Sequence, residues 1–238
     1  MSGERFAIVT GTSSGIGVAV ARQLLERGWH VVGIARRKAS FGERYEHMSV
    51  DLSDVGTASA AIERQLGPRL AEVRWRRVAL VNNAAIGLAG RVQNLEAAEL
   101  LRSYALNAVM PLWLMGFVVK RARAPVRVVN VSSGAAVRAF PGLAAYCSSK
   151  AALRMAGMTV SAEIDKDLAV LSYEPGVVDT EMQLATRSKS TEEFPWVDSF
   201  RRFHAEGMLV SPELPAADIV KFLEGEGGER FAEARRGA

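Results

Sequence analysis

The sequence has little of what metal sites and disulfides require. Its 238 residues include one cysteine, Cys147, and three histidines. A single cysteine excludes an intramolecular disulfide and a multi-thiolate metal centre, so we expect no metal ion and a reducing cytoplasmic setting. Cys147 itself is interpreted as an inert packed thiol, with a redox switch as the alternative.

Neither a membrane-spanning hydrophobic run nor a secretory leader is expected. No stretch approaches the roughly 20 apolar residues that a membrane-spanning helix needs. The chain passes within a few residues into the short apolar run Phe6-Ala7-Ile8-Val9, whereas a signal sequence would place basic residues before a longer apolar run and a small-residue cleavage site. We therefore expect no membrane partner. Since the composition is 49% hydrophobic, the chain can bury one large core, and its length fits a single domain, 1–238.

An excess of charge of one sign is nearly absent. The formal net charge is +4, and the arginines are spread along the chain. This distribution is typical of a solvated basic surface rather than of a nucleic-acid-binding patch. We expect no nucleic acid partner, whereas small anionic molecules fit the charge balance.

Short apolar runs alternate with amphipathic segments over most of the chain. Strands are expected at 6–10, 30–34, 47–50, 78–81, 126–131 and 169–173, and helices at 16–27, 55–66, 95–120, 146–164 and 212–223. The helix at 55–66 is expected to stop at Gly67-Pro68. Continuous apolar strands separated by helices predict an α/β fold: a Rossmann-like, doubly wound parallel sheet with helices on both faces. The more polar segment 177–212 is interpreted as a substrate lid, not as a second domain.

A glycine-rich turn joins the first expected strand to the first helix. Glycine permits a tight turn, lets a pyrophosphate approach the backbone, and opens a helix whose N-terminus favours negative charge. In this strand-turn-helix context the pattern predicts a dinucleotide site, with an ordinary loop as the alternative. The residues of this turn are Gly11, Ser13, Ser14, Gly15, Ile16 and Gly17.

Basic residues follow the second expected strand, where an acidic residue would bind the adenine ribose of NAD. Arginine there suits the 2′-phosphate of NADP. Arg36 is the stronger candidate and Arg37 its helper, unless both only face solvent. Asp51, with Leu52, follows the third strand and is expected beside the adenine, although a helix cap would look the same.

Further along, Asn83 and Ala84 are expected to pack against the cofactor after the fourth strand. Tyr146 and Lys150 stand four residues apart and therefore share one helix face. An unperturbed phenol has a pKa near 10, and we expect the neighbouring ammonium to lower it. Ser133 lies at the carboxyl end of the fifth strand, where ligands bind in such sheets.

Asn107 lies within the long helix, four residues before Pro111. Because proline lacks an N–H, we expect a local irregularity there that frees a backbone carbonyl to bind water near the lysine.

Together these residues closely resemble the classical short-chain dehydrogenase/reductase family, over nearly the whole chain. The family's glycine motif matches Gly11, Gly15 and Gly17, and its catalytic tetrad matches Asn107, Ser133, Tyr146 and Lys150. Its Pro-Gly motif matches Pro175-Gly176, and Val178 and Thr180 fall among the nicotinamide-contacting positions. One departure is Ala85, where the family usually has glycine, and a methyl group is tolerable there if φ is negative.

The resemblance implies NADPH/NADP+ as cofactor and hydride transfer to a small-molecule carbonyl. In the family, Tyr146 would protonate the oxygen, Lys150 would hold the nicotinamide ribose, Ser133 would orient the carbonyl, and Asn107 would hold a relay water. It also implies a homodimer or homotetramer joined through the helices after the fourth and fifth strands.

The segment after the sixth strand is similar to the subgroup with benzil reductases and sepiapterin reductase, and more so to the former. We therefore hypothesise reduction of one carbonyl of a bulky or aromatic 1,2-diketone to an α-hydroxy ketone. The lid's aromatic residues would contact the aryl groups, or else form a small core of the lid itself. The alternatives are a pterin-type ketone reductase, an alcohol dehydrogenase for another substrate, and a non-catalytic NADP(H)-binding sensor.

Overall fold

Seven parallel strands form one sheet in the order β3-β2-β1-β4-β5-β6-β7 in the computed structural model, which describes residues 3–72, 75–226 and 228–237. The strands are β1 (Arg5–Thr10), β2 (His30–Ala35), β3 (Tyr45–Ser49), β4 (Arg77–Asn82), β5 (Val126–Val131), β6 (Leu168–Glu174) and β7 (Phe231–Arg235). The strand order reverses between β1 and β4, and ligands bind beyond the carboxyl ends of strands at such a point.

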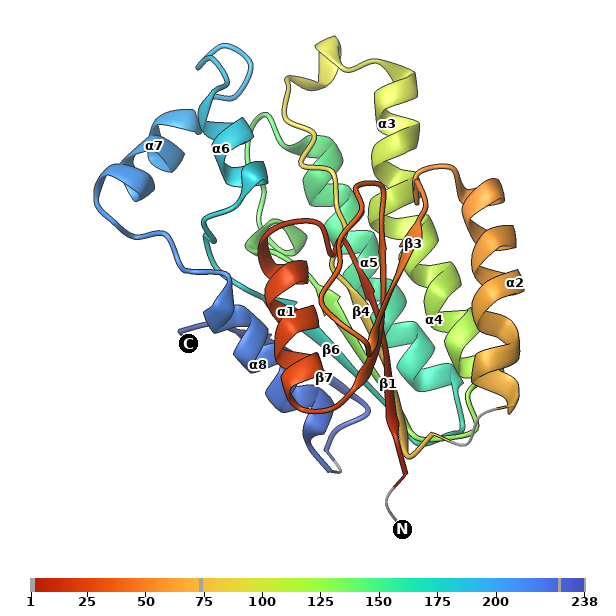
Figure 1. Ribbon diagram of the computed structural model, residues 1–238. Coiled ribbons are helices and arrows are strands. Elements are labelled where there is room, and N and C mark those ends of the chain that lie inside the picture. The colour runs from red at the N-terminus through yellow and green to blue at the C-terminus, as the bar shows by residue number, and fades with distance from the viewer. Residues whose placement is uncertain (1–2, 73–74, 227, 238) are drawn as a thin grey trace.

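Helices cover both faces of the sheet (Figure 1). On one face lie α1 (Gly15–Glu26) and α8 (Glu213–Glu224), and on the other lie α2 (Val55–Glu72), α4 (Met110–Arg121) and α5 (Ala144–Glu163). This arrangement confirms the predicted doubly wound α/β fold.

Two cores result, one on each face of the sheet, and β1 contributes to both. Phe6 and Ile8 pack into the core beneath α2, α4 and α5, whereas Ala7 and Val9 pack into the core beneath α1 and α8. Successive side chains of a strand point to opposite faces, so a strand covered on both sides must be apolar throughout. Burial of both faces is therefore why the strand sequences show no alternation.

The predicted end of the second helix at Gly67-Pro68 is wrong. Helix α2 continues through Pro68 to Glu72. Leu66 and Leu70, which flank the proline on the same face, are 2% and 0% exposed. Their burial against the sheet outweighs the intrahelical hydrogen bond that proline removes.

The long helix expected at 95–120 consists of three parts. A separate 3₁₀ turn at Val92–Asn94 precedes it; then α3 (Ala97–Tyr104) leads through a π turn, Ala105–Val109, into α4. In this turn the N–H of Met110 donates to the carbonyl of Ala105, five residues earlier. Pro111 has no N–H to offer the carbonyl of Asn107. The predicted irregularity is thus confirmed.

The continuous helix Ala97–Arg121 is long and apolar enough to cross a membrane by length and composition alone. This differs from our expectation that no segment reaches that limit. Half of its most apolar stretch is buried inside the protein, where α4 packs on the sheet. The apolar side chains of this helix therefore contribute to the protein core.

The seventh strand was not predicted. β7 pairs in parallel with β6, from Val170↔Phe231 to Glu174↔Arg235, and closes one edge of the sheet. The neighbouring strand β6 is mostly apolar and buried, whereas β7 carries Glu233 and Arg235 and is largely exposed. A short edge strand with charged residues has no hydrophobic pattern that marks it in a sequence.

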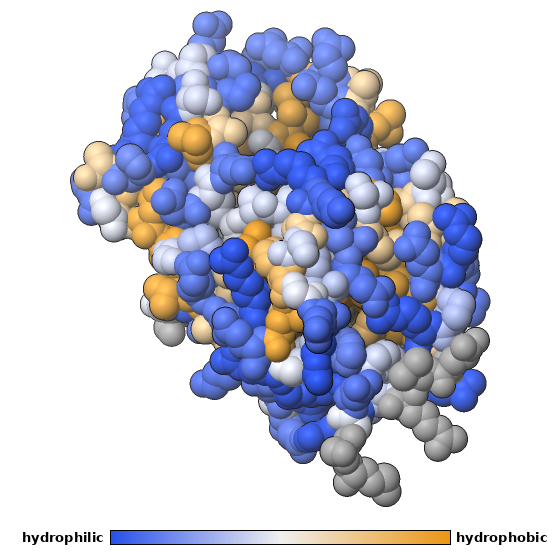
Figure 2. Space-filling model, in the orientation of Figure 1, coloured by the Kyte–Doolittle hydropathy of each residue, from blue (hydrophilic) through white to orange (hydrophobic). Residues whose placement is uncertain are grey.

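Between β6 and α8 the chain forms α6 (Glu181–Arg187) and α7 (Val197–Ala205). Figure 1 shows both helices beyond the carboxyl ends of the strands, on the opposite side from α3. In the space-filling view of Figure 2, apolar surface lies in a hollow between this segment and α3, with a hydrophilic rim. The lid and α3 thus face one another across this hollow.

Candidate active site

Three of the predicted catalytic residues meet at the carboxyl end of β5. Ser133 follows the strand and caps a 3₁₀ turn, where its hydroxyl accepts a hydrogen bond from the N–H of Ala135 at 3.2 Å. Tyr146 and Lys150 lie in the first turns of α5, with the Lys150 Nζ 5.6 Å from the centre of the Tyr146 ring. The same ammonium donates to the carbonyl oxygen of Val131 at 2.7 Å. The backbone end of β5 therefore positions the lysine beneath the tyrosine.

Burial governs the protonation of this pair. It raises the pKa of the Tyr146 phenol to about 12, and a hydrogen bond with the Ser133 side chain only partly offsets the rise. It also lowers the pKa of Lys150 to about 8. The pKa of the phenol is therefore raised rather than lowered as we expected, because desolvation is the largest influence on it. At neutral pH the tyrosine is a neutral donor and the lysine is mainly charged.

Asn107 lies in the π turn and is 1% exposed. Its amide bonds the backbone of Ile86 from both ends: Oδ1 accepts from the N–H at 2.8 Å, and Nδ2 donates to the carbonyl at 2.9 Å. Nδ2 also lies 3.1 Å from the Ser149 hydroxyl. Asn107 thereby connects the loop after β4 to α5, at Ser149, which lies between Tyr146 and Lys150 in the chain.

The glycine turn fits a dinucleotide for steric reasons. Gly11 and Gly15 have φ of +75° and +56°, a region that side chains rarely adopt. A Cβ on Gly17 would lie 2.1 Å from the carbonyl oxygen of Gly11. Only glycine lets α1 begin this close to the turn, and the resulting backbone cradle matches the approach that a pyrophosphate requires. Ser13 lies in the turn, Ser14 is the N-cap of α1, and Ile16 is buried behind them.

Asn83 and Ala84 connect β4 to this turn. The Thr10 hydroxyl accepts hydrogen bonds from both of their N–H groups, at 2.9 and 3.0 Å, and the Asn83 amide donates to the Thr10 carbonyl at 2.8 Å. Among the described residues only glycines have a positive φ, so Ala85 meets the condition for tolerating its methyl group.

At the end of β2, Arg36 and Arg37 are both exposed. Arg37 pairs with a carboxylate of the lid, whereas the charge of Arg36 acts on Asp51. Arg37 forms a bidentate ion pair with Glu181 of α6, at 2.7 and 3.1 Å. Hydrogen bonds from Ser53, then the charges of Arg36 and Arg102, lower the pKa of the Asp51 carboxyl.

Asp51 is not the cap of α2. Its carboxylate accepts from the N–H and hydroxyl of Ser53, whereas Asp54 accepts from the N–H of Thr57 at the start of the helix. Asp54, and not Asp51, is therefore the residue that caps α2. The neighbouring Leu52 is 4% exposed and part of the core.

After β6 the chain returns to the glycine turn. Gly176, next to Pro175, has φ of +78°, and the buried Val178 forms a parallel bridge with Val210. Thr180 is the N-cap of α6, and its methyl group faces Gly15 so closely that a Cβ there would lie at 2.9 Å. A groove of about 370 Å³ runs between the two segments, lined by Ser14, Gly15, Asp179, Thr180, Glu181, Leu184, Arg187 and Pro212.

The lid has an apolar core of its own beside the tyrosine. Phe194 and Val197 are fully buried with Leu143, and Tyr146 and Phe200 pack against them. Phe194 meets Phe200 edge-on with ring centres 5.3 Å apart. Phe194 and Phe200 therefore belong to the small core that we considered as the alternative, whereas Trp196 remains 41% exposed.

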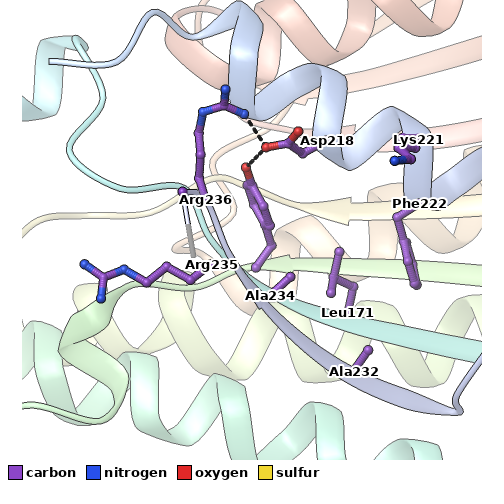
Figure 3. Close-up of a pocket in the computed structure, with 10 residues that line it drawn as sticks. Leu171, Asp218, Lys221, Phe222, Ala232, Ala234, Arg235 and Arg236 are labelled. Carbon is purple, nitrogen blue, oxygen red and sulfur yellow. Dashed lines mark hydrogen bonds and ion pairs between the residues drawn. The ribbon is translucent and has the colours of Figure 1, made fainter.

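A second pocket, of about 590 Å³, lies between α8 and β7, away from these residues (Figure 3). Its floor is apolar, with Leu171 and the small Ala232 and Ala234. On one wall Asp218 accepts hydrogen bonds from Tyr173, at 2.6 Å, and from Arg236. No group of three or more His, Cys, Asp and Glu side chains that suits a metal ion occurs within the described part of the chain.

Three polar residues of the site escaped the sequence analysis. Thr10 closes an apolar strand and Ser149 lies between the tyrosine and the lysine, so both carried a local signal as polar residues at a predicted site. Glu181 carried none, because its partner Arg37 is 144 residues away in the chain.

A parallel sheet with a glycine turn after β1 and a Ser-Tyr-Lys cluster after β5 defines an oxidoreductase of the nicotinamide-dependent, doubly wound class. Residues 5–191 match the short chain dehydrogenase family, and the chain belongs to that family. It is an enzyme that acts on CH–OH and C=O groups, and the family binds NAD(H) or NADP(H).

The chain is 36% identical over 225 residues to benzil reductase ((S)-benzoin forming) of Bacillus subtilis, covering 91% of this chain and 92% of the relative. It is 30% identical over 256 residues to sepiapterin reductase of Xenopus tropicalis, covering 94% and 93%. The crystal structure of the KRED1-Pglu enzyme superposes with a TM-score of 0.82 at 27% identity, covering 96% of this chain and all of the other. The predicted family and its similarity to benzil reductases are confirmed.

Proposed function

We propose that this protein is an NADPH-dependent carbonyl reductase that converts one carbonyl of a bulky or aromatic 1,2-diketone into an α-hydroxy ketone. The observation that carries the proposal is the cluster of Ser133, Tyr146 and Lys150, covered by an aromatic lid that packs against the tyrosine. Benzil reductases among its relatives support the same substrate class.

The cofactor would be held by the backbone cradle of the glycine turn, with Arg36, assisted by Arg37, at the 2′-phosphate and Asp51 and Leu52 near the adenine. When bound, NADPH supplies the hydride for the substrate carbonyl. Arg36 is exposed at the end of β2, and residues 36–39 that follow the strand include no aspartate or glutamate, which favours a phosphate over free ribose hydroxyls.

Tyr146 would be the proton donor. Its raised pKa keeps the phenol protonated at neutral pH, so it has a proton to give as the carbonyl oxygen gains negative charge. Ser133 would hold that oxygen, and the Lys150 ammonium would stabilise the phenolate left after transfer. Asn107 would hold the loop after β4, and its backbone carbonyl would bind a relay water, because Pro111 cannot donate to it.

The remaining contacts would come from the segment after β6. Pro175, Gly176, Val178 and Thr180 would face the nicotinamide, and residues 177–212 would cover the substrate. Aryl groups would lie against the outer side of the lid core, where Phe200 and Tyr146 are only partly buried.

The experiment is to follow NADPH oxidation by the purified protein with benzil, with NADH and sepiapterin in parallel. We expect turnover of benzil and a strong preference for NADPH. Tyr146→Phe is the control without proton donor, and Arg36→Ala should weaken NADPH binding about 10- to 100-fold while leaving NADH binding unchanged. Preference for NADH would overturn the cofactor assignment.

Turnover of sepiapterin alone would move the protein to the pterin reductases, a class favoured by its 30% identity to sepiapterin reductase. Tight NADPH binding without turnover of any carbonyl would favour the non-catalytic sensor. The presence of all four tetrad positions argues for catalysis.

The subunits would associate as a homodimer or homotetramer through α3, α4 and α5. Large apolar side chains are exposed on these helices and on the π turn between α3 and α4: Leu101 is 72%, Val109 48%, Leu112 47% and Met155 56% exposed. Burying exposed apolar side chains of this size between subunits would remove them from water. We place the protein in the cytoplasm, because its single cysteine suits a reducing compartment.

A further inference from the structure

Glu181 places a carboxylate between two segments that the proposed function assigns to the cofactor. Its oxygens lie 2.7 and 3.1 Å from the two terminal nitrogens of Arg37, after β2. The ion pair with Arg37 lowers the pKa of this carboxyl. One anionic group of the lid thus engages an arginine after β2 and lines the same groove as Ser14 of the glycine turn.

This geometry is the one that a phosphate takes. Arginine binds carboxylate and phosphate with the same pair of parallel N–H bonds, so the two ligands exclude one another at a single guanidinium. Glu181 also lies in the first turn of α6, next to Thr180, whose methyl group faces Gly15. The first turn of the lid is therefore seated against the glycine turn.

We propose that the Glu181 carboxylate is an internal substitute for the 2′-phosphate of NADPH, and that the phosphate must displace it from Arg37. This inference rests on the proposed NADPH dependence and deepens it. Glu181 is then a specificity-determining residue that weakens binding of the phosphorylated cofactor, and displacement frees the first turn of α6 from the β2 side of the groove.

The size of the effect follows from exposure. The side chains of Arg37 and Glu181 are 58% and 62% exposed, so water competes for both partners and the pair is weak. We expect Glu181→Gln to tighten NADPH binding about two- to five-fold and to leave NADH binding unchanged, because only the former has the phosphate.

The test is a fluorescence titration that gives Kd for NADPH and NADH with wild type, Glu181→Gln, Arg37→Ala and the double variant. Adenosine 2′,5′-bisphosphate serves as a third ligand, because it carries the 2′-phosphate but has no nicotinamide to contact the lid. We expect Glu181→Gln to tighten it as much as NADPH, and to have no effect in the Arg37→Ala background. Glu192→Gln, which removes an exposed lid carboxylate elsewhere, is the matched charge control.

Two results would overturn the inference alone: Arg37→Ala weakens NADPH binding while Glu181→Gln changes nothing, or Glu181→Gln weakens NADPH and NADH equally. The second would mean that the ion pair clamps the lid over any cofactor. If wild type binds NADH as tightly as NADPH and neither arginine matters, the proposed cofactor fails as well. The control variant separates a local contact from a general change in charge.

Discussion

The two ends of the proposed cofactor site treat charge in opposite ways. At the catalytic end Lys150 is 2% exposed and hydrogen-bonded to the backbone of β5, and burial lowers its pKa to about 8. At the phosphate end the side chain of Arg37 is 58% exposed, and its ion pair with Glu181 raises its pKa. The sheet and its helices hold the first cation, whereas only another side chain holds the second.

This difference in burial determines whether each end controls protonation or ligand preference. The buried Lys150 and the partly buried Tyr146 have protonation states set by desolvation, which suits proton transfer. An exposed arginine keeps its charge and exchanges partners at low cost, which suits recognition of an anion. Substitutions should therefore act on rate and pH dependence at the first end, and on ligand preference at the second.

The largest expected effect is on turnover at the buried end. Tyr146→Phe should lower kcat by about 10²- to 10⁴-fold, because it removes the proton donor, with little change in NADPH affinity. Steady-state kinetics and cofactor titration measure both. Tyr173→Phe, which removes a buried hydroxyl bonded to Asp218 outside the site, is the control and should keep its activity. Retention of a tenth of wild-type turnover by Tyr146→Phe would contradict the assignment.

The next effect is a pH dependence of stability. In the unfolded chain Lys150 has its ordinary pKa of 10.5, above the folded value of about 8, so between these pH values the unfolded state binds more protons and stability rises with pH. The free energy of unfolding of wild type, relative to Lys150→Met, should therefore increase by about 2–3 kcal/mol from pH 8 to pH 10. Urea unfolding at each pH measures it, with Lys120→Met as the exposed control. A constant difference would disprove the burial argument.

A smaller effect on stability is expected at the glycine turn, which lies between the two ends. Gly17→Ala should cost about 1–3 kcal/mol of unfolding free energy and abolish cofactor binding, because its Cβ would collide with the Gly11 carbonyl. Gly56→Ala, at an exposed helical position of α2 with ordinary contacts, should instead stabilise the protein by about 0.4–1 kcal/mol. Thermal and urea unfolding distinguish the two, and equal effects would mean that the turn is not sterically constrained.

The smallest effect is expected for stability at the exposed end. Arg37→Ala should leave the urea unfolding midpoint unchanged, since its ion pair is open to solvent, although it should weaken NADPH binding. A clear loss of stability would show that the Arg37–Glu181 pair helps to hold the fold together, and would remove the contrast between the two ends.

The sequence by itself determined the sheet, the first six of its seven strands in chain order, and the positions of the glycine turn and the Ser-Tyr-Lys cluster. These features follow from local patterns: apolar runs, glycines at a strand-helix junction, and a four-residue spacing on one helix face. It also indicated the irregularity at Asn107, because the missing N–H of Pro111 is a local property.

Tertiary structure alone decided the rest. Helix α2 passes through Pro68 because Leu66 and Leu70 are buried on the sheet, and β7 forms because β6 offers an open edge. Desolvation by distant segments sets the pKa values of Tyr146 and Lys150. Glu181 meets Arg37 only because the chain after β6 returns to the glycine turn, and no local pattern encodes a contact between residues so far apart in sequence.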